Sequence, residues 1–244
     1  MGMPRPEPVH AASQHERIRE FYDSVYYRDA EKVGPVPGHL RRLAKKLGPW
    51  HGLRVLDVAC GTGSWLAATA ALGAIPAGVD ISEKALEICR RRLPHAELYH
   101  GPAEQLPFGD GQFDFVSCLG ALEHFSDPHA ALREMVRVAK ASAVFILLVP
   151  NSGFLTRRLG LFRGTAQAQV LEQARSLGEW KELFESAGLK VVHRWRDLHV
   201  LSPSWIFCGR WLGWPLRLAQ AVALPFWPLS WQYQVYHLCV IPRR

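Results

Sequence analysis

Short apolar runs alternate with amphipathic stretches through the middle of the chain, and this alternation constrains the fold more than any other feature of the sequence. Strands that lie parallel need long crossover connections, which helices usually supply. The pattern therefore predicts a doubly wound α/β fold, in which helices cover both faces of one sheet. The runs expected to form strands are Val55–Val58, Ile75–Val79, Ala96–Tyr99, Phe113–Cys118, Val144–Val149, Lys190–Trp195 and Gln232–Ile241.

Local capping signals place several of the helices. Ser82 is suited to cap a helix that runs from Glu83 to Leu93, and Asp127 followed by Pro128 forms a typical helix start. A chain of 244 residues with 48% apolar residues is enough for one large core, so we expect a single domain. Further helices are expected near residues 15–30, 40–47, 65–72 and 178–187.

The positive charge of the chain is concentrated in its second part. Residues 1–150 carry 17 basic and 17 acidic side chains, whereas residues 151–244 carry 12 basic and 5 acidic ones. No acidic residue follows Asp197. This asymmetry favours an anionic partner, which could be a nucleic acid, a membrane surface or an anionic small molecule.

The cysteines and the hydropathy pattern indicate the compartment. The five cysteines form no Cys-x-x-Cys pair and lie in apolar runs, which is typical of buried thiols rather than of disulfides or a metal site. The first residues lack the apolar core of a signal peptide, and no run of about eighteen apolar residues could span a bilayer. We therefore expect a cytoplasmic protein without a metal centre.

A glycine-containing turn after the first strand is the strongest sign of a ligand site. Gly61 and Gly63 let the backbone turn sharply, and Asp80 ends the next strand, where a carboxylate can accept hydrogen bonds from both hydroxyls of a ribose. Leu66 stands where a nicotinamide dinucleotide site prefers a third glycine. Asp57 is poorly placed beside a pyrophosphate but suits an ammonium group. These residues favour S-adenosylmethionine over NAD.

This turn and several later motifs resemble those of the class I S-adenosylmethionine-dependent methyltransferases. The motifs follow one another in the family's order across residues 50–150. They are Asp57-x-x-x-Gly61-x-Gly63, Gly78-Val79-Asp80-Ile81-Ser82, Gly101-Pro102-Ala103-Glu104-Gln105-Leu106-Pro107-Phe108, Phe113-Asp114-Phe115-Val116-Ser117 and Ala121-Leu122-Glu123-His124-Phe125-Ser126-Asp127-Pro128.

The resemblance implies a Rossmann-like, mixed seven-stranded sheet with an antiparallel last strand, and S-adenosylmethionine as the cofactor. It divides the single domain into an N-terminal helical lid (1–50), a cofactor-binding half (51–150) and an acceptor-side half (151–244). Tyr22, Tyr26 and Tyr27 either close over the cofactor or belong to a packed amphipathic helix. The residues that the resemblance assigns to the cofactor are Asp57, Gly61, Thr62, Gly63, Asp80, Ile81, Ala103, Glu104 and Leu119.

Two positions depart from the family's pattern. Pro102 stands where members often have an Asp that reaches the adenine amino group, so Glu104 or the backbone at Ala103 would have to take that contact. Lys140-Ala141-Ser142 replaces a Pro-Gly-Gly turn before the fifth strand, which implies a loop of a different shape.

The resemblance also implies methyl transfer by direct displacement, which needs an aligned nucleophile and the exclusion of water. A hydroxyl nucleophile benefits from a base. His124 is the candidate catalytic residue because it lies just past the carboxyl end of the fourth strand. The alternative role for this histidine is a structural hydrogen bond at a turn.

A Trp-rich insertion at about 202–231 separates the last two strands and is expected to shape the acceptor site. Trp favours the boundary between hydrocarbon and water, and the segment has basic edges and no acids, so it could meet a membrane and a lipophilic or lipid-linked acceptor. Alternatively, its aromatic residues pack on the sheet or on a second chain. Arg157, Arg158 and Arg163 either hold an anionic group of the acceptor or form a solvated loop. The tryptophans of the insertion are Trp205, Trp211, Trp214, Trp227 and Trp231.

We therefore expect a methyltransferase that acts at oxygen on a small lipophilic or lipid-linked acceptor and can associate peripherally with a membrane. The sequence has no Asn-Pro-Pro-aromatic motif, no Pro-Cys pair and no appended nucleic-acid-binding motif, so a nucleic acid is not the expected acceptor. The alternatives are a non-catalytic S-adenosylmethionine-binding regulatory or scaffold protein, a nucleic-acid methyltransferase and an NAD-dependent oxidoreductase.

Overall fold

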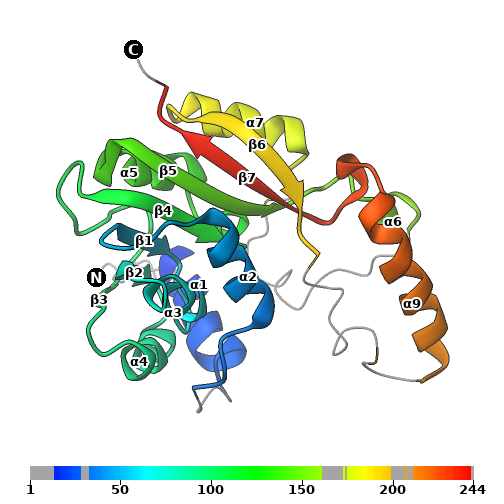
Figure 1. Ribbon diagram of the computed structural model, residues 1–244, viewed down its shortest axis with the longest axis horizontal. Coiled ribbons are helices and arrows are strands. Elements are labelled where there is room, and N and C mark those ends of the chain that lie inside the picture. Colours follow the sequence, from blue (N-terminus) through cyan, green and yellow to red (C-terminus); the bar gives the residue numbers. More distant parts are fainter. Residues whose placement is uncertain are drawn as a thin grey trace, which may run out of the picture.

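The computed structural model describes residues 14–28, 33–160, 173, 175–198, 207 and 211–242. Its seven strands are β1 (Arg54–Val58), β2 (Ile75–Asp80), β3 (Glu97–His100), β4 (Phe113–Leu119), β5 (Ala139–Pro150), β6 (Lys190–Arg196) and β7 (Gln234–Val240). They form one sheet in the order β3-β2-β1-β4-β5-β7-β6 (Figure 1). All neighbours are parallel except β7, which is antiparallel to β5 and β6. The predicted mixed, doubly wound sheet is confirmed.

Helices cover both faces of this sheet (Figure 1). Side chains from α5 (Pro128–Val138) and α7 (Leu177–Ser186), among them Leu132 and Trp180, form the core on one face. Side chains from three other helices, among them Leu66 and Leu86, form the core on the opposite face. These helices are α2 (Gly38–Leu47), α3 (Ser64–Ala70) and α4 (Glu83–Arg92).

The local capping signals of the sequence are confirmed. The Ser82 hydroxyl accepts a hydrogen bond from the Ala85 N–H at 3.1 Å and caps α4. Asp127 accepts one from the Ala130 N–H at 2.9 Å, with Pro128 in the first turn of α5. Four of the five cysteines are described, and all four are buried free thiols, as expected; Cys208 lies outside the described residues.

Two predictions about elements are corrected by the structure. β5 begins directly after α5, so Lys140–Ser142 belongs to a strand and not to a loop. Ala139 pairs with Phe113 of β4, and a register shift follows in that pair, so long-range pairing extends the strand where the sequence suggested a turn. The first helix is also shorter than expected: α1 (Gln14–Phe21) continues as the π-helical turn η1 (Tyr22–Tyr26).

The described part of the Trp-rich insertion is helical. It consists of the turn η5 (Trp211–Gly213), the helix α9 (Trp214–Ala223) and the turns η6 (Leu224–Phe226) and η7 (Leu229–Trp231). Trp205 of the insertion and Arg163 before it lie outside the described residues. None of the helices in the described part of the chain is long and apolar enough to cross a bilayer.

Candidate active site

A cavity lies at the carboxyl ends of the parallel strands, beneath α1 and η1. In open α/β sheets, ligands bind at this end, where the strand order reverses, and here the chain reverses direction across the sheet between β1 and β4. The wall combines residues at the ends of β1, β2 and β4 with the loop 101–104 and the segment 124–126.

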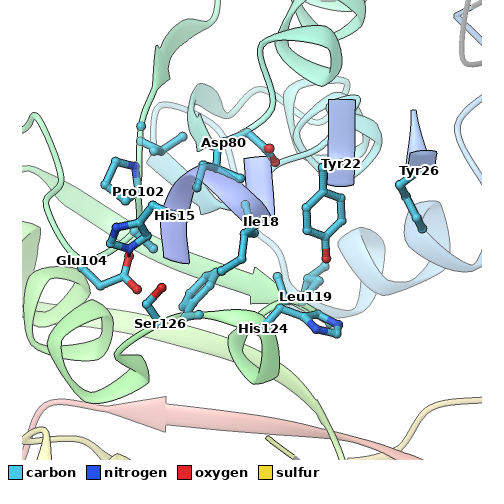
Figure 2. A pocket seen from close by; sticks show the side chains of 18 of the residues that line it. His15, Ile18, Tyr22, Tyr26, Asp80, Pro102, Glu104, Leu119, His124 and Ser126 are labelled. Atoms are coloured by element: carbon cyan, nitrogen blue, oxygen red, sulfur yellow. Dashed lines mark ion pairs between the residues drawn. The ribbon is translucent and has the colours of Figure 1, made fainter. Parts of the chain in front are cut away.

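Six of the ten predicted site residues line this cavity together. Asp80 ends β2 and Ile81 follows it, Ala103 and Glu104 lie in the loop after β3, and Leu119 ends β4. The sixth is His124, in the short 3₁₀ turn η2 (Leu122–His124). Figure 2 shows four of them, Asp80, Glu104, Leu119 and His124, around the same space but on separate parts of the chain. Parallel pairing of neighbouring strands explains the convergence, because it brings their carboxyl ends to one edge.

The Asp80 carboxylate has two roles in this wall. Its Oδ2 accepts a hydrogen bond from the Gly61 N–H at 2.7 Å, and its Oδ1 accepts one from the Ser82 N–H at 2.9 Å. Burial raises its pKa to about 6, although these two N–H donors act in the opposite direction. A carboxylate has about four acceptor sites, so Asp80 can fix the glycine turn and still accept bonds from a ligand.

Glu104 already has a partner for each oxygen. Its Oε1 accepts the Asp127 N–H at 3.1 Å, and its Oε2 lies 3.3 Å from Nε2 of His15. The latter contact joins α1 to the loop after β3 and is drawn as a dashed line in Figure 2. The backbone at Ala103 is therefore the better candidate for the adenine contact that the absent Asp would otherwise make.

The three lid tyrosines lie over the cavity. Tyr22 and Tyr26 belong to η1, and all three, including Tyr27, line the cavity. Burial raises the pKa of Tyr22 and of Tyr27 well above the usual range, so both phenols are neutral. The turn is fastened below by Asp23, which accepts a hydrogen bond from the Ser82 hydroxyl at 2.5 Å.

The Tyr27 hydroxyl lies against the glycine turn. A Cβ added at Gly61 would come within 2.8 Å of the Tyr27 oxygen, so glycine is required for this close approach. Gly61 also has a φ of 53°, which disfavours residues with a side chain. The lid and the turn therefore meet where the amino-acid end of the cofactor was expected.

Three other predicted cofactor residues lie outside the cavity wall. Asp57 is buried, accepts a hydrogen bond from the Ser117 hydroxyl at 2.7 Å, and has a pKa that burial raises to about 8. A Cβ at Gly63 would collide with the Cys89 sulfur, so this glycine lets α4 approach the turn. The Thr62 carbonyl accepts a hydrogen bond from Arg92 at 2.8 Å. Their contacts with a cofactor, like that of Gly61, stay predictions.

His124 lines the cavity from the short turn that follows β4. It is 4% exposed, and its Nε2 lies 4.0 Å from Oε1 of Glu123. The rings of Tyr22 and His124 are 6.5 Å apart and nearly perpendicular. In Figure 2 the Tyr22 hydroxyl points toward Leu119 and His124. A phenol, an imidazole and apolar neighbours suit a reaction at a hydroxyl group shielded from water.

Two polar residues that line the cavity were missed from the sequence. His15 is one, because the amphipathic pattern of its helix says nothing about its distant partner Glu104. Ser126 is the other: its hydroxyl is buried and has no hydrogen-bond partner within the part of the chain that the structure describes. A buried polar atom of this kind calls for a partner, and a ligand in the cavity can supply it.

Comparison with known proteins agrees with this geometry. A family model described as a methyltransferase domain matches residues 56–147. A demethylmenaquinone methyltransferase from Staphylococcus aureus (strain MRSA252) is 37% identical over 114 residues, which cover 44% of this chain and 47% of that protein. The match thus spans about half the length of this relative.

Solved structures with low sequence identity share the fold over nearly the whole chain. Magnesium protoporphyrin IX methyltransferase from Synechocystis PCC 6803, solved with bound SAH, superposes with a TM-score of 0.62 at 18% identity over 93% of this chain and 99% of that one. The [4+2]-cyclase SpnF superposes with a TM-score of 0.66 at 18% identity over 100% of both chains. Residues 56–147 therefore match a methyltransferase domain, and the sheet around them has the Rossmann-like methyltransferase fold.

Proposed function

We propose that this chain is an S-adenosylmethionine-dependent methyltransferase that methylates a small lipophilic or lipid-linked acceptor at oxygen. The observation that carries the proposal is the cavity at the carboxyl ends of the strands, which Asp80 and His124 line together with apolar side chains. The matched methyltransferase domain includes both residues. A relative named for demethylmenaquinone supports a small-molecule acceptor.

The residues present fit the nucleoside part of S-adenosylmethionine. Asp80 would hold the ribose hydroxyls, Ile81 and Leu119 would cover the adenosine with apolar surface, and the backbone at Ala103 would meet the adenine edge. The unpartnered Ser126 hydroxyl offers a further polar contact inside the cavity. The amino-acid end would share the space at Gly61 with the Tyr27 hydroxyl.

When bound, S-adenosylmethionine supplies an electrophilic methyl group on a sulfonium sulfur. The chain has to align the acceptor, exclude water and remove a proton from the attacking hydroxyl. His124 Nε2 would take that proton, and Glu123, 4.0 Å away, would stabilise the resulting imidazolium. Tyr22, which is neutral and half-buried, would close the water side of the acceptor.

The fold by itself does not determine the reaction, because it is shared with a protein named as a [4+2]-cyclase. A non-catalytic S-adenosylmethionine-binding protein is therefore the main alternative. Calorimetry with S-adenosylmethionine and with NAD separates binding of the two cofactors. Transfer of a labelled methyl group to a cell extract, followed by the mass of the product, separates a methyltransferase from a scaffold. The proposal requires heat with S-adenosylmethionine and label in a small, solvent-extractable product.

Heat without any labelled product would favour the scaffold. Label in RNA or DNA, with binding that weakens steeply as salt rises, would favour a nucleic-acid methyltransferase.

A further inference from the structure

The helix α9 and the turns on either side of it carry exposed apolar side chains, which we call the α9 stripe. Trp214, Leu218 and Val222 follow at intervals of four residues on α9 and are 37%, 51% and 64% exposed. Trp211, in the turn η5 before the helix, is 69% exposed, and Phe226, at the end of the turn η6 after it, is 84% exposed. Side chains four apart in a helix share one face, so the three residues of α9 lie on one side of the helix. Such a surface on a monomer commonly marks an interaction site.

The turns that follow α9 are attached to the sheet. Ala221 and Leu224, on the inner side, are buried. The Gln232 side chain donates a hydrogen bond to the Leu224 carbonyl at 2.8 Å, which joins η6 to the residues just before β7. The buried Asn151 side chain donates one to the Ser230 carbonyl at 2.8 Å, which joins η7 to the end of β5.

Basic side chains accompany the stripe. Arg157 and Arg158 are exposed on the short helix α6 (Leu155–Arg158), which follows β5. Phe154, at the start of α6, packs on Tyr233 with ring centres 4.9 Å apart, so α6 is attached to the segment that follows α9. Arg217 lies on α9 itself, and the sequence after Asp197 contains no acid. This end of the molecule is apolar and positively charged.

We propose that the α9 stripe and the neighbouring arginines dock on an anionic lipid bilayer. Exposed Trp and Phe side chains suit the boundary of the hydrocarbon layer, and arginines suit anionic headgroups. A helix of ten residues is about 15 Å long, so α9 lies flat in the interface and does not span it. A second copy fits less well, because a two-fold contact places the same positive patch on both sides.

Docking there brings the candidate active site to the membrane. β5 runs parallel to β4, so its end lies at the same edge of the sheet as the cavity. Asn151 directly follows β5 and binds the Ser230 carbonyl, so α9 and the turns after it are attached at this edge. The Gln173 N–H donates to the Glu123 carbonyl at 2.8 Å, and the Ser152 N–H donates to the Arg175 carbonyl at 2.8 Å, which connects this part of the fold to the cavity rim. A lipophilic acceptor could then enter without crossing water.

Flotation of the full chain with vesicles tests this surface without any cofactor or acceptor. We expect the wild type to float with phosphatidylcholine vesicles that contain phosphatidylglycerol. Val222→Glu with Phe226→Glu should lower binding at least about tenfold, because two apolar side chains can no longer be buried in the lipid. The matched control is Ile75→Glu with Val192→Glu, at positions 53% and 48% exposed on distant strands, and it should float normally.

The arginines are tested separately. Arg157→Ala with Arg158→Ala should weaken binding to anionic vesicles more than to neutral ones, whereas Lys190→Ala with Arg194→Ala on β6 should have no effect. The proposal is overturned by a wild type that stays in the soluble fraction, or by a glutamate variant that floats equally well. A dimer in size-exclusion chromatography that the glutamate variant dissociates, without vesicle binding, would assign the stripe to a second copy. Calorimetry with S-adenosylmethionine tests the proposed function independently of all these outcomes.

Discussion

The cofactor wall around Asp80 and the α9 stripe stand at the same edge of the sheet but are built in opposite ways. In the cofactor wall, the carboxyl groups of Asp80 and Glu104 each have two partners that the surrounding elements hold in place. The α9 stripe is apolar and exposed, and its side chains have few partners within the described fold. Hydrogen-bonded polar groups in a site require a defined geometry, whereas an exposed apolar face is suited to bind a surface outside the chain.

His124, in the cavity wall, gives the largest expected effect. His124→Ala should lower turnover by about 10²–10⁴-fold, because in the proposed reaction the acceptor hydroxyl loses its base, and should leave S-adenosylmethionine affinity unchanged. His129→Ala, on α5 and outside the cavity wall, is the matched control. Full activity of the alanine variant at every pH would assign His124 a structural role.

Asp57 gives the next largest effect, on stability. Burial raises its folded-state pKa from 3.8 to about 8, so the folded chain holds a proton that the unfolded chain has released. The stabilisation that comes from this extra bound proton is fully present below about pH 4. It is lost as the pH rises toward about 8, and the free energy of unfolding falls by up to about 1.4 kcal/mol per pH unit. Asp57→Asn, which stays neutral, should remove this slope from urea-unfolding free energies measured across that range.

The same group links stability to cofactor binding. Should an ammonium group of the cofactor reach Asp57, binding near neutral pH would release a proton, which calorimetry in buffers of different ionisation enthalpy detects. The asparagine variant is the control for this proton. An equal unfolding slope in wild type and variant would show that Asp57 is ionised in the folded chain.

Variants of Asp80 separate two roles of its carboxyl group, which are to support the glycine turn and to bind the ligand. Asp80→Ala should weaken S-adenosylmethionine binding by about 1.5–3 kcal/mol, because charge-assisted hydrogen bonds to the ribose are lost. It also leaves the N–H groups of Gly61 and Ser82 without their acceptor, so the free energy of unfolding should fall as well. Asp80→Asn keeps one acceptor oxygen and should show an intermediate loss in both measurements. Unchanged affinity in the alanine variant would remove Asp80 from the ribose site.

The sequence predicts the local features of the site better than its long-range contacts, for a physical reason. Ser82 and Asp127 act on atoms three residues away, and the glycine turn follows directly from its strand, so local spacing carries the information. The Tyr27 contact with Gly61 and the His15 contact with Glu104 join segments far apart in sequence, and no local pattern encodes them.

The elements predicted wrongly or incompletely were also set by long-range contacts. Lys140–Ser142 became strand because Ala139 pairs with Phe113. The insertion was recognised from its tryptophans and prolines, and its helix α9 was not predicted.

Gly63 tests packing behind the cofactor wall. Gly63→Ala should cost about 1–2 kcal/mol of stability from its φ of 74° alone, and the collision with the Cys89 sulfur adds to that. Cys89→Ala removes the sulfur, so the double variant should regain the part due to the collision and retain the part due to the backbone. A double-mutant cycle of urea-unfolding free energies separates the two. If the losses of unfolding free energy in the two single variants simply add in the double variant, the Cβ at position 63 does not collide with the Cys89 sulfur.

The smallest effect is expected in the α9 stripe and is the sharpest test of the contrast between the two regions. Leu218 is half exposed, and glutamine forms helices nearly as well as leucine, so Leu218→Gln should change the free energy of unfolding by less than about 0.5 kcal/mol. The same variant should bind anionic vesicles more weakly than the wild type, because the lost apolar surface faces the lipid. A leucine within a packed core would instead cost about 2–5 kcal/mol when truncated. A loss of that size for Leu218→Gln would mean that the α9 stripe stabilises the fold itself. The stripe would then resemble the cofactor wall, and the contrast between the two regions would disappear.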